Sequence, residues 1–304
     1  MKKYQKIILS VIICTIITSA SACLSSSNKS EKPGNTEVSK SDNSPQNPDY
    51  ARPGSKKEGT DPLNKTTLDA SSSVPSDKIS QRIYSDYGAI LRVQNGAKPP
   101  PTLIFSNENE CLNWQSTVNT QKESIGGISI ELQQVAMQNL LKARDEAKQS
   151  GVDITPRGSD AARRSYADTV RLWTSRVTPG LDYWLKKGRL DSTTAAGIRS
   201  LSPNNQVGEI LNLENQGMNF STDFSKSILY SVAAPGTSQH LSMLALDVNQ
   251  HENAKVREIL ARNGWFQTVV SDLPHFTYLG VQENQLTSIG LRKTVSGGRS
   301  FWVP

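Results

Sequence analysis

The hydrophobic pattern of the chain changes from helical periodicity in its middle to shorter alternating stretches near its end. Apolar residues recur at helical spacing from Leu132 to Ala147, which predicts a helix over residues 131–149 that ends before Gly151. Ser165 and Asp168 have the spacing of a capping box and predict that another helix begins there. Further helical segments are predicted at residues 181–185, 195–201, 207–213 and 253–263.

Short strands are predicted between and after these helices. They cover residues 102–105, 152–156, 245–248, 265–270 and 276–279, and residues 296–298 have the composition of a late turn. A short helix capped by Asn107 is expected after the first strand. Because strands and helices do not alternate regularly, the pattern favours an α+β fold with a small, mostly antiparallel sheet flanked by helices over a doubly wound parallel sheet.

Residues 1–22 have the pattern of an export signal. Three lysines within the first six residues precede a largely apolar run over residues 7–17, which is too short to span a bilayer and suits a signal peptide. Small residues then precede Cys23 in an order that resembles the lipobox of bacterial lipoproteins. The resemblance implies that Cys23 is lipidated and anchors an exported protein to a membrane, facing the periplasm or cell wall. An ordinary cleavage site beside an incidental cysteine is the alternative.

Composition divides the rest of the chain. Residues 23–79 are rich in Ser, Asn, Lys, Asp, Pro and Gly and poor in apolar side chains, so they cannot bury enough surface to fold. We interpret them as a disordered tether, with order expected to begin near Ile79. Residues 80–127 are interpreted as an N-terminal elaboration packed on the main domain, which is expected to occupy residues 128–304.

Charge and cysteine content narrow the classes of partner. The 304-residue chain has a formal net charge of +6, and without the three lysines of the signal segment 31 basic residues face 28 acidic ones. This excess is too small to indicate nucleic-acid binding, which requires a clustered basic face, and no obligate protein partner is evident. Cys111 would be the only unmodified cysteine of the exported chain, so we expect no internal disulfide and a buried, inert thiol.

Two of the three histidines in the chain, His240 and His275, lie in segments that also carry an aspartate. His240 precedes Asp247 by seven residues, which is too far along one strand or helix for both to reach a single metal ion, so a turn is expected at residues 241–243. In a strand over residues 244–248, Asp247 faces away from the apolar side chains and towards a site. His275 adds a second imidazole, and the three together form a ligand set for catalytic zinc. Asp272 is then a carboxylate that can accept a proton from water.

Two motifs resemble those of zinc D-alanyl-D-alanine carboxypeptidases of the vancomycin-resistance type. Residues 238–247, S-Q-H-L-S-M-L-A-L-D, resemble S-x-H-x-x-G-x-A-x-D, and residues 272–278, D-L-P-H-F-T-Y, resemble E-x-x-H-F-x-Y. The resemblance covers about residues 128–280 and implies a hedgehog/D,D-peptidase-like fold that acts on peptidoglycan stem peptides. It also implies that His240, Asp247 and His275 bind Zn²⁺ and that Asp272 is the general base.

Two departures from the motifs leave the cleaved bond open. Met243 stands where the first motif has glycine, which puts the geometry of the local turn in question. Asp272 replaces glutamate, as in the related L-alanyl-D-glutamate endopeptidases. A D-alanyl-D-alanine carboxypeptidase is therefore the first hypothesis, an L-Ala-D-Glu or other murein endopeptidase the second, and a non-catalytic wall-binding lipoprotein the third.

The family also has an upstream S-G-Y-R-S motif whose arginine binds the substrate or the developing oxyanion. Arg164 matches the end of this motif in sequence, whereas Arg157 matches its position just after a predicted strand, so both remain candidates. A fixed guanidinium can clamp a carboxylate or an oxyanion in either case. Ser238 is a further candidate for substrate binding, and His251, in a polar run, is expected to be exposed.

Overall fold

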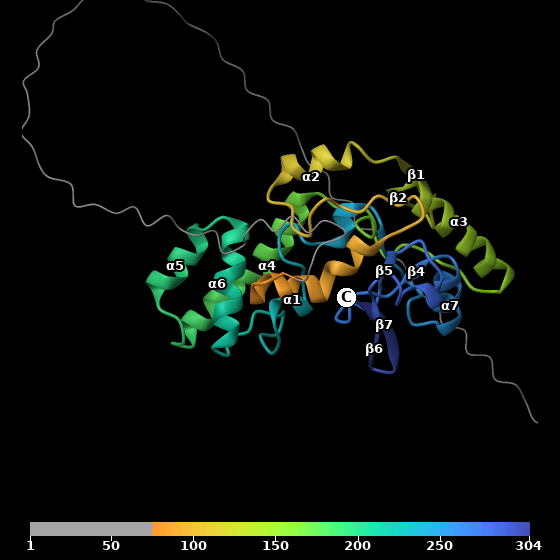
Figure 1. Cartoon of the computed structure of the whole chain (residues 1–304). Helices are drawn as coiled ribbons and strands as arrows, with labels where there is room; N and C mark the ends of the chain where they lie inside the picture. The colour runs from red at the N-terminus through yellow and green to blue at the C-terminus, as the bar shows by residue number, and fades with distance from the viewer. Residues whose placement is uncertain (1–74) are drawn as a thin grey trace, which may run out of the picture. The chain divides into compact units, whose positions relative to one another are not determined.

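A computed structural model describes residues 75–304, and Figure 1 shows how their helices and strands are arranged. The signal segment, Cys23 and most of the predicted tether lie outside the described residues. The first described helix, α1 (Lys78–Tyr87), begins close to the predicted start at Ile79, and Asp77 caps it by accepting a hydrogen bond from the Ser80 amide at 2.8 Å. A short 3₁₀ helix, η1 (Gly88–Arg92), follows directly.

The core of the fold contains a three-stranded antiparallel sheet with the strand order β3–β5–β4. These strands are β3 (Ala245–Asp247), β5 (His275–Tyr278) and β4 (Trp265–Phe266). The central strand β5 is buried along its whole length, and Trp265 and Phe276 are among the largest fully buried side chains. The prediction of an α+β fold with a small antiparallel sheet is confirmed, although β4 is shorter than the predicted strand over residues 265–270.

Helices α3 (Gln134–Gln149) and α7 (Ala254–Arg262) lie together beside this sheet (Figure 1). Asn253 caps α7 by accepting a hydrogen bond from the Lys255 amide, which confirms the predicted helix. The predicted start of α3 at residue 131 is wrong, because residues 131–133 belong to β2 (Ile128–Gln133), which pairs with β1 (Thr120–Ile125). Ile130 and Leu132 are both buried, as expected for alternate residues of a strand. Leu132 also has helical spacing to the apolar residues of α3, which is why the sequence pattern alone extended the helix to residue 131.

Helices α4 (Tyr166–Lys186), α5 (Ser192–Ser200) and α6 (Pro203–Asn215) form a second group, in which α5 and α6 lie on the opposite side of the molecule from α3 and α7 in Figure 1. The predicted capping box at Ser165 and Asp168 is present, with both reciprocal hydrogen bonds. The separate helix predicted at residues 181–185 is wrong, because α4 continues through Pro179. Gly180 follows this proline, and a Cβ atom there would overlap the Phe220 ring.

Two predicted strands are absent from the described structure. Residues 102–105 form a local turn in which the Thr102 hydroxyl donates to the Ile104 carbonyl at 3.1 Å. Residues 152–156 contribute only an isolated bridge between Pro156 and Val248, because proline has no N–H to extend a ladder. The predicted late turn is confirmed, since residues 297–298 join β6 (Arg292–Ser296) to β7 (Arg299–Val303).

Residues 80–127 pack directly against the segments that follow. The Gln94 amide donates to the Leu279 carbonyl at 3.0 Å. Asn107 caps α2 (Glu108–Gln115) as predicted, and Gln115 in that helix donates to the Leu241 carbonyl at 2.9 Å. Cys111 is fully buried, and burial raises the pKa of its thiol to about 12, which makes it inert as expected. None of the helices within residues 75–304 combines the length and apolar character needed to cross a bilayer.

Candidate metal centre

His240 and Asp247 are positioned by a tight turn followed by a strand. His240 lies in a 3₁₀ helix, η3 (Gln239–Ser242), and Met243 then adopts a left-handed conformation with φ 58° before β3 begins. The turn predicted at residues 241–243 is therefore confirmed. Met243 adopts the backbone conformation that glycine favours at a strain of roughly 1–2 kcal/mol, and its fully buried side chain packs in a cluster with Leu241 that offsets this strain.

Gly236 fixes the loop that leads into η3. Its φ is 76°, and its carbonyl accepts a hydrogen bond from the Phe105 amide at 3.0 Å. A Cβ atom at this position would overlap the Phe105 carbonyl, so only glycine permits the approach. This contact anchors the start of the segment that carries Ser238 and His240.

The β3–β5 pairing brings Asp247 directly opposite His275. Asp247 Oδ1 lies 3.2 Å from His240 Nε2 and 3.3 Å from His275 Nδ1, and the two imidazole nitrogens are 3.1 Å apart. Within residues 75–304 these three residues form the one group of His, Cys, Asp and Glu whose ligand atoms converge closely enough to hold a metal ion. The structure therefore brings together the three ligands that the sequence predicts.

Hydrogen bonds on the far side of each imidazole determine which nitrogen carries its proton. His240 Nδ1 lies 2.7 Å from the Ala162 carbonyl, which can only accept, so the proton is on Nδ1 and the Nε2 lone pair is free. Gln239 donates its amide nitrogen to the Tyr87 carbonyl at 2.9 Å, which leaves its oxygen facing His275 Nε2 at 2.9 Å. His275 therefore donates from Nε2, and its Nδ1 lone pair faces the other two ligand atoms.

This donor set fits a tetrahedral cation. Two imidazole lone pairs and a carboxylate oxygen converge without a proton between them, an arrangement that is repulsive unless a positive charge lies among them. Ligands about 2.0–2.1 Å from a tetrahedral metal are about 3.3 Å from one another. The observed separations of 3.1, 3.2 and 3.3 Å match this value.

The surroundings of His240 and Asp247 favour the protonation states that metal binding requires. Burial lowers the pKa of His240, so its imidazole is neutral at neutral pH. Arg164 donates from Nη2 to Asp247 Oδ2 at 2.8 Å, which leaves Oδ1 directed at the imidazoles.

The two candidate arginines occupy different environments. Arg164 lines the cleft beside the metal ligands and also donates from Nε to the Asp160 carbonyl at 3.0 Å. Arg157 is exposed and does not line that cleft, although its backbone amide donates to the Asp247 carbonyl at 2.9 Å. Of the two, only Arg164 has a side chain placed to act at the metal centre.

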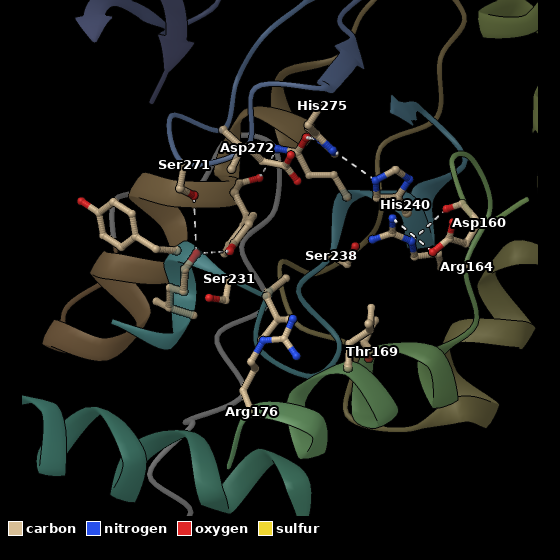
Figure 2. Close-up of a pocket in the computed structure, with 18 residues that line it drawn as sticks. Asp160, Arg164, Thr169, Arg176, Ser231, Ser238, His240, Ser271, Asp272 and His275 are labelled. Atoms are coloured by element: carbon tan, nitrogen blue, oxygen red, sulfur yellow. Dashed lines mark hydrogen bonds and ion pairs between the residues drawn. The ribbon is translucent and has the colours of Figure 1, made fainter. Parts of the chain in front are cut away.

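The metal centre forms part of the wall of a cleft of about 270 Å³ (Figure 2). Asp272 lines the same cleft from an exposed position, in a turn closed by a hydrogen bond from the His275 amide to the Asp272 carbonyl at 3.2 Å. Ser238 is buried at the start of η3 and also lines it. His251 lies outside the cleft and is partly buried rather than exposed, with Nδ1 3.0 Å from the Val248 carbonyl.

Two groups with important contacts have no assigned role in the sequence motifs. Gln239 lies between the motif's serine and histidine and fixes the His275 imidazole, while the Ala162 carbonyl fixes His240. A backbone carbonyl leaves no signal in the sequence. The glutamine stands within the motif, but only the fold shows that its side chain turns towards β5.

Replacing Gln239 by methionine is expected to weaken zinc binding by about 10- to 100-fold, because the outer hydrogen bond of a ligand imidazole holds its orientation and tautomer. A competition titration against a chromogenic chelator measures the change. Thr268→Val is the matched control. The Thr268 hydroxyl donates to the same Gln239 oxygen at 3.2 Å but makes no hydrogen bond to either imidazole of the cluster. An equal loss in both variants would mean that the hydroxyl network, and not the imidazole, sets the affinity.

The sequence matches no known protein-family profile and no curated protein. Among solved structures, it is similar to a variant of the vancomycin-resistance D,D-pentapeptidase VanY from a VanB-type resistance cassette, in complex with Zn(II). The similarity covers 54% of this chain and 79% of that one, with 18% sequence identity and a TM-score of 0.29. At this TM-score, the case for the metal centre rests on its own geometry.

Proposed function

We propose that the protein is a zinc-dependent peptidase that acts on peptidoglycan stem peptides. The observation that carries the proposal is the convergence of three proton-free ligand atoms, from His240, Asp247 and His275, beside an open cleft that the two histidines line. Two nitrogen donors and one carboxylate oxygen are the donor set of catalytic zinc sites, which leave a position for water. Held by these three residues, zinc would supply the acidification of a water molecule, to a pKa of about 7, and the polarisation of a carbonyl group.

The residues around this centre have separate roles in the proposed reaction. Asp272 accepts a proton from the attacking water and delivers it to the leaving amine; no ion pair within residues 75–304 neutralises it. Arg164 holds the Asp247 carboxylate in place and presents positive charge to the cleft, where it can stabilise a developing oxyanion. Ser238 offers a hydroxyl to the substrate backbone from the cleft wall.

A D-alanyl-D-alanine carboxypeptidase is the activity that the motifs favour. Met243 adopts the left-handed conformation expected at the glycine position of the first motif, which supports the assignment of that motif. A murein endopeptidase remains the second candidate because Asp272 replaces the glutamate of the second motif. We further propose that the chain is an exported lipoprotein anchored through Cys23, with its catalytic domain facing the periplasm or cell wall.

Digestion of a stem pentapeptide by the zinc-loaded full chain tests this proposal. Mass spectrometry is expected to detect the loss of one D-alanine, and chelation followed by zinc addition is expected to abolish and restore it. Release of a longer fragment would move the assignment to an endopeptidase. Stoichiometric zinc without cleavage of any stem peptide would overturn the enzymatic proposal in favour of a wall-binding protein.

A further inference from the structure

A second arginine enters the cleft from helix α4. Figure 2 shows the Arg176 side chain reaching up from this helix into the space between Ser231 and Thr169, on the same cleft as His240. Arg176 donates from Nη1 to the hydroxyl of the neighbouring Ser175 at 2.9 Å. Its Nε is buried and has no hydrogen-bond partner among the described residues.

Arg176 differs in this respect from Arg164 on the same cleft. Arg164 uses Nη2 for Asp247 and Nε for the Asp160 carbonyl, so two of its three nitrogens are already engaged by the protein. No carboxylate within residues 75–304 forms an ion pair with Arg176. A guanidinium presents parallel N–H groups that match the two oxygens of a carboxylate, and a buried N–H without an acceptor is costly.

Apolar side chains also line this cleft. Leu172, Leu229 and Val232 are among its lining residues, together with the polar Thr169 and Ser231 and with His240, His275 and Asp272. A ligand that spans the cleft therefore meets a cation and small apolar surfaces together, within the same cavity as the candidate catalytic groups. A carboxylate on a residue with a small apolar side chain matches this combination.

We propose that Arg176 is the subsite for the free α-carboxylate of a substrate's C-terminal residue. This inference rests on the proposed peptidase function and deepens it, because it commits the cleft to peptides that end beside the metal centre. Arg176 thus selects carboxypeptidase substrates over internal peptide bonds, whose carbonyl at this position carries no charge. We therefore assign the binding of a terminal carboxylate, for which Arg157 and Arg164 were the candidates from the sequence, to Arg176.

The test is the affinity for N-acetyl-D-alanyl-D-alanine and for its C-terminal amide, measured by NMR titration of the zinc-loaded full chain in an Asp272→Asn background that slows turnover. The acid is expected to bind about 10- to 100-fold more tightly than the amide, as a charge-assisted hydrogen bond implies. Arg176→Gln is expected to abolish this preference, because it weakens the binding of the acid and leaves the binding of the amide unchanged. Arg176→Lys, which keeps the charge and guards against a folding defect, is expected to retain part of it.

Arg171→Gln is the matched control, because Arg171 lies on the same helix with a side chain that is 66% exposed and paired with Asp168. It is expected to leave both affinities unchanged. Equal binding of acid and amide by the parent protein, or an undiminished preference in Arg176→Gln, would overturn the subsite. Hydrolysis is measured separately, in protein that retains Asp272. If the peptide is cleaved but the preference for the acid does not depend on Arg176, only the subsite is contradicted. If the preference depends on Arg176 but no peptide is cleaved, the subsite is supported and the proposed peptidase function is contradicted.

Discussion

Replacing either His240 or His275 by alanine is expected to remove zinc and to lower peptide hydrolysis by at least about 10³-fold, since a Lewis-acid metal supplies several kcal/mol of transition-state stabilisation. Each variant deletes one of three ligand atoms that lie 3.1–3.3 Å apart. The two remaining protein ligands cannot complete a catalytic zinc site. Metal content by inductively coupled plasma mass spectrometry, measured beside the rate of D-alanine release, checks both parts of the prediction.

His251 provides the matched control for these variants. It is the third histidine of the chain, lies outside the cluster, and contacts the Val248 carbonyl and Glu252. His251→Ala is expected to retain one equivalent of zinc and wild-type hydrolysis. Full activity in His240→Ala, or loss of zinc from His251→Ala alone, would show that the metal lies elsewhere.

Replacing Asp272 by asparagine is expected to lower kcat by about 10²- to 10⁴-fold, the usual contribution of a general acid–base group. The zinc content is expected to stay the same, because Asp272 lies on the cleft but outside the ligand cluster. Asparagine keeps the size of the side chain and removes its ability to accept the proton of water. Single-turnover kinetics with zinc-loaded protein separates this loss from a change in substrate binding.

Asp160 offers the comparison, because it is a second exposed carboxylate on the same cleft. Its side chain lies 4.0 Å from Arg164 Nη2, and no reacting role is proposed for it. Asp160→Asn is expected to retain most of kcat. If Asp160→Asn loses as much activity as Asp272→Asn, the proton acceptor is wrongly assigned or shared.

The parts of the structure that the sequence predicts are those encoded within short stretches. The capping box at Ser165 and the cap at Asn107 each depend on residues within one turn, and both are present. The turn before Asp247 follows from spacing alone, because seven residues of straight helix or strand keep the two ligands too far apart. The strand pairing that completes the ligand set joins residues 28 positions apart, and the motifs specify both ends of it.

The parts that the sequence misses depend on contacts between distant segments. Leu132 continues both a strand pattern from Ile130 and a helical pattern towards Leu140, so the predicted helix wrongly includes residues 131–133 at the end of β2. Arg176 has the sequence context of a solvated helix face, and only the packing of α4 against the cleft gives it a role. The Ala162 carbonyl that orients His240 is a backbone atom, which any residue provides equally.

We expect one zinc ion to bind His240 Nε2, Asp247 Oδ1 and His275 Nδ1. Crystals of the full chain prepared with one equivalent of zinc allow a direct measurement, through an anomalous difference map recorded at the zinc absorption edge. One peak is predicted about 2.0–2.2 Å from each of these three atoms. A zinc peak at His251, or a cluster that binds no zinc while its imidazoles and carboxylate keep the present arrangement, would contradict the claim.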